Sequence, residues 1–296
     1  MRLVALVLNW NGGEDTLRAL ESLAGIEAIC VDNGSTDGSD AEVERRYPQV
    51  ELIRNGANLG YAEGNNVGLR RALERGADWV LLVNDDAVAE PGVADALERA
   101  ARARPDAGIL ACKILFEDGR TVMYAGASFN VLLGYSGRRD GFGRPDRFHE
   151  LRDVARADGA AMALSRPLLE RVGLLDAELF AYAEDVDLSL RARAAGFAIV
   201  FVPDAIFRHK GSASTGGSAS THNLYYDTRN TIVVCERLRP LPPGLRALRR
   251  GVVVGAHLVQ AAAHPSRRAA ARAVIEGWSD ARAGRLGERR VTPARP

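Results

Sequence analysis

The strongest constraint on the fold is an apolar run, Trp79 to Val83, that ends abruptly in Asn84, Asp85 and Asp86. The run shows no alternation of apolar and polar residues, so it predicts a strand buried on both faces, as parallel strands of α/β sheets are. Ligands of such sheets bind beyond the carboxyl ends of the strands. The two aspartates therefore form a candidate site for a divalent cation such as Mg²⁺ or Mn²⁺. The alternative is that they only cap a helix beginning near Pro91.

The sequence before this run repeats a strand, a polar loop and a helix three times. Strands are predicted at 2–8, 26–31 and 50–54, with helices at 14–23, from 36 or 37 to 46, and in the segment ending near 76. Three such units leading into a fourth strand predict the first half of a doubly wound, mostly parallel α/β sheet flanked by helices. Later strands are expected at 108–115, 123–127, 159–165 and 198–202, and later helices at 91–104, 166–172 and 184–196.

Two of the loops carry residues that suit a ligand site. The second loop, VDNGSTDGS, begins with Asp32, which follows a strand just as Asp86 does. A simple connection between strand and helix is the alternative, because the loop is rich in residues that tolerate positive φ and cap helices. The helix after the third loop contains Gly64 and Gly68, and helix interiors disfavour Gly by roughly 1 kcal/mol relative to Ala. These glycines indicate close approach of a ligand or of a neighbouring backbone.

Several classes of protein are excluded by what the sequence lacks. No G-x-G-x-x-G follows the first strand and no G-x-x-x-x-G-K-[ST] occurs, so dinucleotide and P-loop sites lack their phosphate cradle. If phosphates bind, a cation must therefore neutralise much of their charge. The three cysteines, Cys30, Cys112 and Cys235, have neither metal-site spacing nor the density of a disulfide framework, which favours a reduced, cytosolic setting.

A second acidic cluster, Glu184, Asp185 and Asp187, opens the helix that ends at Gly196. The helix macrodipole favours acids in a first turn, but three carboxylates exceed what that effect requires. Asp185 projects about 100° away from the face shared by the other two and can point at a ligand. His209 follows a later strand; a lone His is more often structural, yet an imidazole near two acidic clusters is a candidate third contributor to a metal site.

Two further segments are expected near the site. The Gly- and Arg-rich segment Gly134 to Arg147 has almost no apolar periodicity and predicts a mobile loop, a candidate lid. Tyr225, Tyr226, Arg229 and Asn230 begin a helix and predict the wall of a pocket.

The charge divides the chain into residues 1–236, a predicted catalytic domain, and residues 237–296, a basic helical C-terminal extension. The extension contains thirteen arginines, no lysine and three acidic residues, a net charge of +10, which leaves −9 for the rest of the chain. Its uncharged stretch, Gly251 to Ala263, is shorter than the ~20 residues that cross a bilayer. Flanking arginines predict an interfacial hairpin on an anionic membrane, and an ordinary helix pair packed on the body is the alternative.

Taken in order, six motifs resemble glycosyltransferase family 2 with its GT-A fold, and within it the rhamnosyltransferase-like members. The motifs are LNWNG, VDNGSTDGS, NLGYAEGNN, LLVNDDA, FAYAEDVDLSLRARAAG and HKGSAS, which span roughly residues 1–236. The resemblance implies an inverting enzyme that moves a sugar from a nucleotide diphosphate to an acceptor hydroxyl. It also implies that Asp32 binds the pyrimidine, whose imide N–H a carboxylate accepts.

The resemblance assigns the remaining roles as well. Asp86 would be the main metal ligand with His209 completing the site, Asp185 the general base, and Glu184 a residue that orients the acceptor or the base. Asn84 departs from an Asp that is often found at this position. The other positions implied in binding the nucleotide sugar are Asn9, Asn11, Asn33, Gly34, Ser35, Asn58, Gly60, Asn65, Asn84 and Asp85.

The resemblance, together with the acidic motifs, implies a Mg²⁺- or Mn²⁺-dependent transferase that moves L-rhamnose from dTDP-rhamnose to a glycan or lipid-linked saccharide in polysaccharide or cell-surface glycan synthesis. A UDP-hexose or galactofuranose donor is the alternative, because uracil and thymine present the same imide edge. A nucleotidyltransferase would be expected to carry a basic loop after the first strand, and LNWNG contains no Lys or Arg. A non-catalytic sugar-nucleotide binding module is the third alternative. We expect a cytoplasmic protein with peripheral contact to the inner face of an anionic membrane through its C-terminal arginines, and no nucleic-acid partner.

Overall fold

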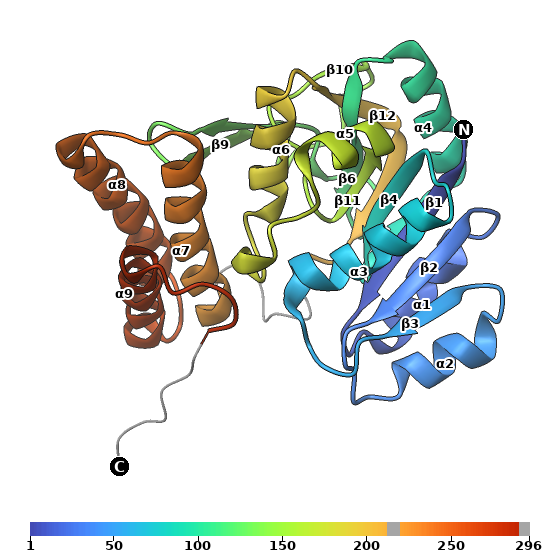
Figure 1. Ribbon diagram of the computed structural model, residues 1–296, viewed down its shortest axis with the longest axis horizontal. Helices are drawn as coiled ribbons and strands as arrows, with labels where there is room; N and C mark the ends of the chain where they lie inside the picture. Colours follow the sequence, from blue (N-terminus) through green and yellow to red (C-terminus); the bar gives the residue numbers. More distant parts are fainter. Residues whose placement is uncertain (212–219, 290–296) are drawn as a thin grey trace.

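The computed structural model describes residues 1–211 and 220–289, with only the backbone of 135–138. In this part of the chain, a ten-stranded mixed sheet forms the centre, with its main strands in the order β10-β12-β6-β11-β4-β1-β2-β3 (Figure 1). The first half consists of β1 (Leu3–Asn9), α1 (Gly13–Ser22), β2 (Glu27–Asp32), α2 (Ser39–Arg46), β3 (Glu51–Arg54), α3 (Gly60–Glu74) and β4 (Trp79–Asn84). These elements confirm the predicted alternation of strand and helix.

The parallel register of this half aligns its polar strand ends. β1 pairs in parallel with both β2 and β4, so Asn9 lies opposite Asp32 and Leu8 lies opposite Asn84. The aspartates after β4 do not cap the next helix, because β5 (Ala87–Ala89) intervenes and the N-cap of α4 (Val93–Ala103) is Gly92. The capping alternative for these aspartates is therefore wrong.

The second half of the sheet contains one strand that runs against its neighbours. β11 (Ala161–Ser165) lies antiparallel between β4 and β6 (Ala107–Phe116), while β12 (Ala198–His209) pairs in parallel with β6. Because β11 runs in the opposite direction, the residues that precede it lie at the edge where β4 ends. The backbone N–H of Asn84 accordingly donates to the carbonyl of Ala160 at 3.0 Å.

Shorter elements complete the body. They are β7 (Val122–Tyr124), β8 (Ala127–Asn130), β9 (Tyr135–Arg139), β10 (Arg152–Asp153), α5 (Arg166–Val172), the 3₁₀ turn η1 (Ala177–Leu179) and α6 (Glu184–Ala194). The prediction of a loop over 134–147 is wrong for its first part, because β9 pairs with β8 in a hairpin.

Apolar side chains pack on both faces of the sheet. Successive residues of a strand point to opposite faces, so Leu6 of β1 joins the cluster that includes Leu69 of α3, whereas Val7 joins the cluster that includes Leu17 of α1. Gly64 and Gly68 of α3 make room for this packing. A Cβ at Gly68 would lie 2.2 Å from the Leu6 side chain, so side chains of β1, rather than a ligand or a backbone, explain why glycine occurs there.

Three C-terminal helices form a separate layer at one end of the sheet (Figure 1): α7 (Thr221–Leu238), α8 (Pro243–Ala262) and α9 (Arg267–Ala283). The predicted boundary between residues 236 and 237 lies within α7. α9 packs closely on α7, because a Cβ at Gly277 would lie 2.4 Å from the Tyr225 carbonyl oxygen. The three helices pack on one another. Within the described ranges no helix has the length and apolar character to cross a membrane. All three cysteines of the chain are buried and unpaired.

Candidate active site

Asn9 is the centre of the hydrogen-bond network at the carboxyl ends of β1 and β2. Its side chain is fully buried, and its amide donates to Asp32 Oδ1 at 2.9 Å and to the Ser39 hydroxyl at 2.8 Å. Its carbonyl oxygen accepts from the Thr16 hydroxyl at 2.7 Å. Asn9 was predicted to bind the donor, and this placement makes it a residue that orients Asp32 and the following loop.

The Asp32 carboxylate is held in one orientation by the loop that follows it. Its Oδ2 accepts backbone N–H groups from Gly34 and Ser35, both at 3.2 Å. Gly34 has φ +78°, and a Cβ there would lie 2.7 Å from the Ala57 backbone, so only glycine fits the turn. The Ser35 hydroxyl accepts the backbone N–H of Asn11 at 2.9 Å, which joins the first and second loops.

Asn33 joins the second loop to the third. Its amide donates to Asn58 Oδ1 at 3.0 Å and to the Gly60 carbonyl at 3.1 Å, while its own oxygen accepts the Leu59 N–H at 3.1 Å. Asn65 is also buried, and its amide donates to the Tyr61 carbonyl one turn earlier in α3. Hydrogen bonds thus join the three loops through Asn9, Ser35 and Asn33, whereas the bond of Asn65 lies within α3.

The acidic motif after β4 lies beside this network. Asn84 Oδ1 is buried and has no hydrogen-bond partner in the described part of the chain. Asp85 Oδ2 lies 3.5 Å from the backbone N–H of Trp10. Burial, together with the negative charge of Asp86, raises the pKa of Asp85 to about 7. Ionisation of the Asp85 carboxyl group is therefore disfavoured unless a positive charge lies near it.

Asp86 and His209 meet as predicted. The His209 Nε2 lies 2.8 Å from Asp86 Oδ1, and both side chains are more than nine-tenths buried. Burial lowers the pKa of His209, but the contact with Asp86 and the charge of Asp158 outweigh it and raise that pKa above its ordinary value. In the part of the chain that the structure describes, no three His, Cys, Asp or Glu side chains are grouped to hold a metal by themselves.

The chemistry of these donors nevertheless fits a cation that a substrate helps to hold. Mg²⁺ and Mn²⁺ favour oxygen ligands, and Mg²⁺ is commonly bound through one or two carboxylates plus substrate phosphates. The unpartnered Asn84 oxygen and the Asp86 carboxylate are such donors, and His209 adds a nitrogen. Asn84, Asp86 and His209 therefore suit the binding of Mg²⁺ or Mn²⁺ together with a substrate phosphate.

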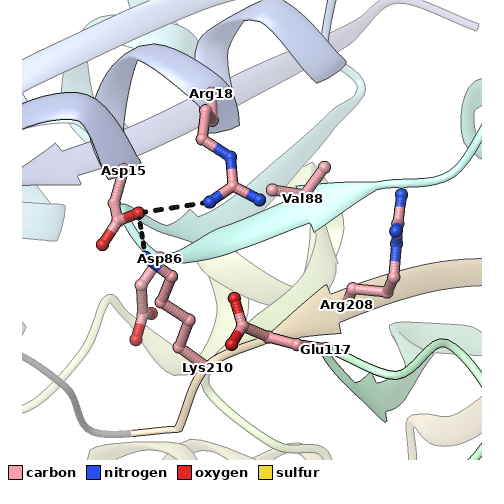
Figure 2. A pocket seen from close by; sticks show the side chains of 7 residues that line it. All are labelled: Asp15, Arg18, Asp86, Val88, Glu117, Arg208 and Lys210. Atoms are coloured by element: carbon pink, nitrogen blue, oxygen red, sulfur yellow. Dashed lines mark hydrogen bonds and ion pairs between the residues drawn. The ribbon is translucent and has the colours of Figure 1, made fainter.

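A small polar cavity adjoins Asp86 (Figure 2). At about 40 Å³ it is far too small for a nucleotide. Lys210, next to His209, forms an ion pair with Asp15 of α1, which also lies 3.6 Å from Arg18. Lys210 was not predicted as a site residue, although its position directly after His209 marks it. The last three residues of HKGSAS lie outside the described residues.

The second acidic cluster reaches the same edge of the sheet through the segment before β11. Asp185 Oδ2 accepts the Gly159 N–H at 3.1 Å and lies 3.5 Å from Arg156 Nη1. The next residue, Ala160, is bonded to Asn84, as described above. Burial raises the pKa of Asp185 more than the Arg156 guanidinium lowers it. A carboxylate with a raised pKa is a stronger proton acceptor than an ordinary one.

Glu184, the residue before Asp185, differs from it in environment. It is 6% exposed, and its Oε2 has no hydrogen-bond partner among the described residues. Burial and the charge of Asp185 raise the pKa of Glu184 well above its ordinary value. The two carboxylates of the predicted pair therefore titrate as a coupled pair.

Asp158 and Arg156 are site residues that the sequence analysis missed. Asp158 Oδ1 accepts the Ala160 N–H at 3.2 Å, and its charge acts on both Asp185 and His209. Arg156 is 3% exposed. The available signal was the Asp-Gly pair at the start of a predicted strand. It could be used only once that strand was known to run antiparallel, which brings its beginning to the site.

The predicted pocket residues of α7 are buried instead. Tyr225, Tyr226, Arg229 and Asn230 are each at most 1% exposed. The prediction that they line a pocket is therefore wrong. Their amide and guanidinium groups instead contact the chain immediately before Glu184.

Comparison with known proteins adds a family and relatives. A model described as glycosyltransferase-like family 2 matches residues 3–228. The chain is 30% identical over 259 residues to an N-acetylglucosaminyl-diphospho-decaprenol L-rhamnosyltransferase of Mycobacterium tuberculosis, covering 79% of this chain and 84% of that protein. It is 28% identical over 233 residues to a low-salt glycan biosynthesis hexosyltransferase of Haloferax volcanii, covering 77% and 73%.

Solved structures similar to this chain include two determined with Mn²⁺. GalNAc-T7 with UDP, GalNAc and Mn²⁺ superposes with a TM-score of 0.62 at 14% identity, over 85% of this chain and 54% of that one. The mannosyltransferase PcManGT of Pyrobaculum calidifontis, in complex with GDP-Man and Mn²⁺, gives a TM-score of 0.56 at 18% identity, over 96% and 86%. At these identities the similarity concerns the fold, and it confirms the predicted GT-A type.

Proposed function

This chain belongs to glycosyltransferase-like family 2, and we propose that it transfers L-rhamnose from dTDP-rhamnose, with inversion, to a hydroxyl of a lipid-linked saccharide. One observation carries the proposal. Gly159 bonds to the carboxylate of Asp185 at the start of α6, and Ala160 bonds to Asn84 of the acidic motif. A proton acceptor and a candidate diphosphate site are thus connected by two consecutive residues.

In this mechanism Asp185 accepts the proton of the acceptor hydroxyl as the new C–O bond forms. Its Oδ2 is oriented by the Gly159 N–H, and burial adapts its basicity to that task. Glu184 orients the acceptor or the base. Asp86, His209 and the Asn84 oxygen would hold a divalent cation, which supplies positive charge to the departing diphosphate.

The nucleotide would bind along the three connected loops. Asp32, oriented by Asn9, accepts the imide N–H of the pyrimidine. Asn11, Ser35 and Asn58 belong to the hydrogen bonds that join the three loops. Rhamnose is favoured by the named activity of the mycobacterial relative, which acts on a diphospho-decaprenol acceptor. A UDP-linked hexose or galactofuranose is the second candidate, because a carboxylate at Asp32 does not distinguish uracil from thymine.

A donor panel tests this function. Purified protein with Mn²⁺ is screened by thermal shift against dTDP-rhamnose, UDP-galactofuranose, UDP-N-acetylglucosamine and GDP-mannose. A donor at ~100 times its dissociation constant should stabilise the fold by about 2.7 kcal/mol. The donor that stabilises is then assayed for transfer to N-acetylglucosaminyl-diphospho-polyprenol. Stabilisation by UDP sugars alone would replace dTDP-rhamnose with a UDP sugar as the proposed donor. Stabilisation by none of the four would contradict the proposal.

We also propose that the C-terminal helices contact an anionic membrane in which the acceptor lipid lies. The first turns of α8 expose Leu245 and Leu248, at 55% and 61%, beside the exposed Arg246. Apolar side chains next to arginines suit an interface of anionic headgroups. We expect wild type to sediment with phosphatidylglycerol vesicles but not with phosphatidylcholine vesicles. Replacing both leucines by Asn should reduce sedimentation with phosphatidylglycerol vesicles. Equal sedimentation of variant and wild type would contradict the contact.

A further inference from the structure

We propose that Arg229 and Asn230 of α7 are positioning residues that hold the catalytic base in place, by fixing the strained segment that precedes α6. The inference rests on the proposed role of Asp185 as the base. Neither residue reaches the reacting atoms, because both are fully buried behind that segment.

The segment from Leu179 to Ala183 is strained. Four non-glycine residues in the described ranges have positive φ, and three of them lie here: Phe180 (+67°), Tyr182 (+65°) and Ala183 (+67°). Phe180, with ψ −62°, is the centre of a γ-turn of the rare strained kind, in which the Ala181 N–H donates to the Leu179 carbonyl at 2.8 Å. A backbone of this kind persists only where its surroundings hold it.

The Asn230 side chain supplies that hold. Its amide nitrogen lies 2.9, 2.7 and 2.8 Å from the carbonyl oxygens of Leu179, Ala181 and Tyr182, which share its two N–H donors. Arg229 Nη2 donates to the Leu179 carbonyl at 2.8 Å, and Arg229 Nε donates to Asn230 Oδ1 at 2.8 Å, which fixes the direction of the amide. Two neighbouring side chains thus bind three carbonyl oxygens of the strained segment, those of Leu179, Ala181 and Tyr182.

Arg229 is in turn fixed by the segment after α9. Its Nη1 donates to the Gly287 carbonyl at 2.7 Å, and the Gly287 N–H donates to the Glu178 carbonyl at 2.7 Å. Its guanidinium also lies 4.8 Å from the ring centroid of Tyr226. The segment after α9 therefore closes over η1, so the C-terminal extension takes part in supporting the base.

The strained segment also touches the donor side. The Phe180 carbonyl accepts the Ala62 N–H of α3 at 3.1 Å, and Gly60 packs against the Phe180 ring. The segment thus lies between the start of α3 and the start of α6. Holding it fixes the distance between the donor loops and Asp185, a quantity to which transfer rates are sensitive: a displacement of about 1 Å costs about 100-fold.

The test compares three variants of the full chain. Asn230→Ala removes the hold. Thr228→Val is the matched control, because Thr228 is fully buried on the same helix but its hydroxyl donates to the Leu224 carbonyl within α7. In the double variant Asn230→Ala with Ala183→Gly, glycine adopts the positive φ without the penalty of a Cβ.

Two readouts are measured: kcat and KM with the nucleotide sugar that wild type uses, and hydrogen–deuterium exchange of residues 177–187. We expect Asn230→Ala to lose about 100-fold in kcat with little change in donor KM, and to exchange faster over 177–187. Glycine at 183 should restore about 5- to 30-fold of kcat, which corresponds to the left-handed penalty of one residue. Thr228→Val should lower the melting temperature and leave kcat and the exchange unchanged.

Wild-type exchange over 177–187 in Asn230→Ala would overturn the proposal. So would a kcat loss in Thr228→Val equal to that in Asn230→Ala, or a double variant no more active than the single one. If wild type turns over no nucleotide sugar, the proposed function fails, and the exchange measurement still decides whether Asn230 holds the segment.

Discussion

Replacement of Asp185 by Asn separates chemistry from structure at the site. Asn has the shape of Asp, and its side-chain oxygen can still accept the Gly159 N–H that now lies 3.1 Å from Asp185 Oδ2. What it cannot do is accept the proton of the acceptor hydroxyl. We therefore expect kcat to fall by about 10²- to 10⁴-fold, the range of a general base. This loss corresponds to about 2.7 to 5.4 kcal/mol of transition-state stabilisation at 1.36 kcal/mol per tenfold.

The same replacement should not destabilise the fold. Burial raises the pKa of Asp185, so the folded state prefers the protonated acid. Stability associated with this group is therefore present at low pH and is lost as pH rises through the raised folded-state pKa. Asn carries no charge at any pH, so the variant should melt at or above the wild-type temperature at neutral pH.

The assay measures initial transfer rates against pH, with nucleotide affinity measured by calorimetry. Wild-type kcat/KM should fall on the acid side with a pKa above the ordinary Asp value, a limb that belongs to the coupled Glu184–Asp185 pair. Asp187→Asn is the matched control. It lies in the same helical turn, but its carboxylate binds Arg191 Nε at 2.7 Å. Wild-type transfer by Asp185→Asn, or equal losses in both variants, would refute the assignment.

Three further outcomes are expected. Gly60→Ala should lower the free energy of unfolding in urea by about 2–4 kcal/mol, because φ is +82° and the methyl group would lie 2.6 Å from the Phe180 ring. Gly38→Ala is the control: its φ is +81° but its surroundings are open, so it should lose only about 1–2 kcal/mol. Asp86→Ala should abolish the increase in melting temperature that Mn²⁺ produces in the presence of dTDP, and an undiminished increase would remove this residue from the metal site. Burial opposes ionisation of Asp146, but the Lys113 ammonium at 2.7 Å outweighs it, so the pKa of Asp146 is lowered. The fold therefore loses stability as acid protonates Asp146 below about pH 4. Lys113→Met should reduce this loss of melting temperature at low pH.

The strand-end part of the site was predictable because it depends on local pattern. An apolar run followed by acids indicates both a buried strand and its carboxyl end, and parallel pairing then brings Asp32 and Asp86 to one edge. The cluster at the start of α6 was predictable for a similar reason. Three carboxylates in one turn exceed what the helix dipole explains.

The remaining features depend on contacts between distant segments. Asp158 precedes its strand, and only the antiparallel direction of β11 brings it to the site. Asn230 and Arg229 resemble pocket residues in sequence, because polar and aromatic residues at a helix start suit solvent or burial equally. These residues are buried because α9 and the segment after it pack on α7. The hairpin of β9 was missed because its glycines and arginines carry no alternation of apolar residues.

The buried cysteines have a practical consequence for measuring motion in this enzyme. Cys30 and Cys112 are fully enclosed by the sheet, and burial raises the pKa of Cys235 to about 11, so the reactive thiolate is scarce at all three positions. Cysteines introduced on the surface would therefore be the ones that a maleimide dye labels, without prior removal of the native thiols. Dye pairs placed on α3 and α8 could then report whether the helical layer shifts during turnover.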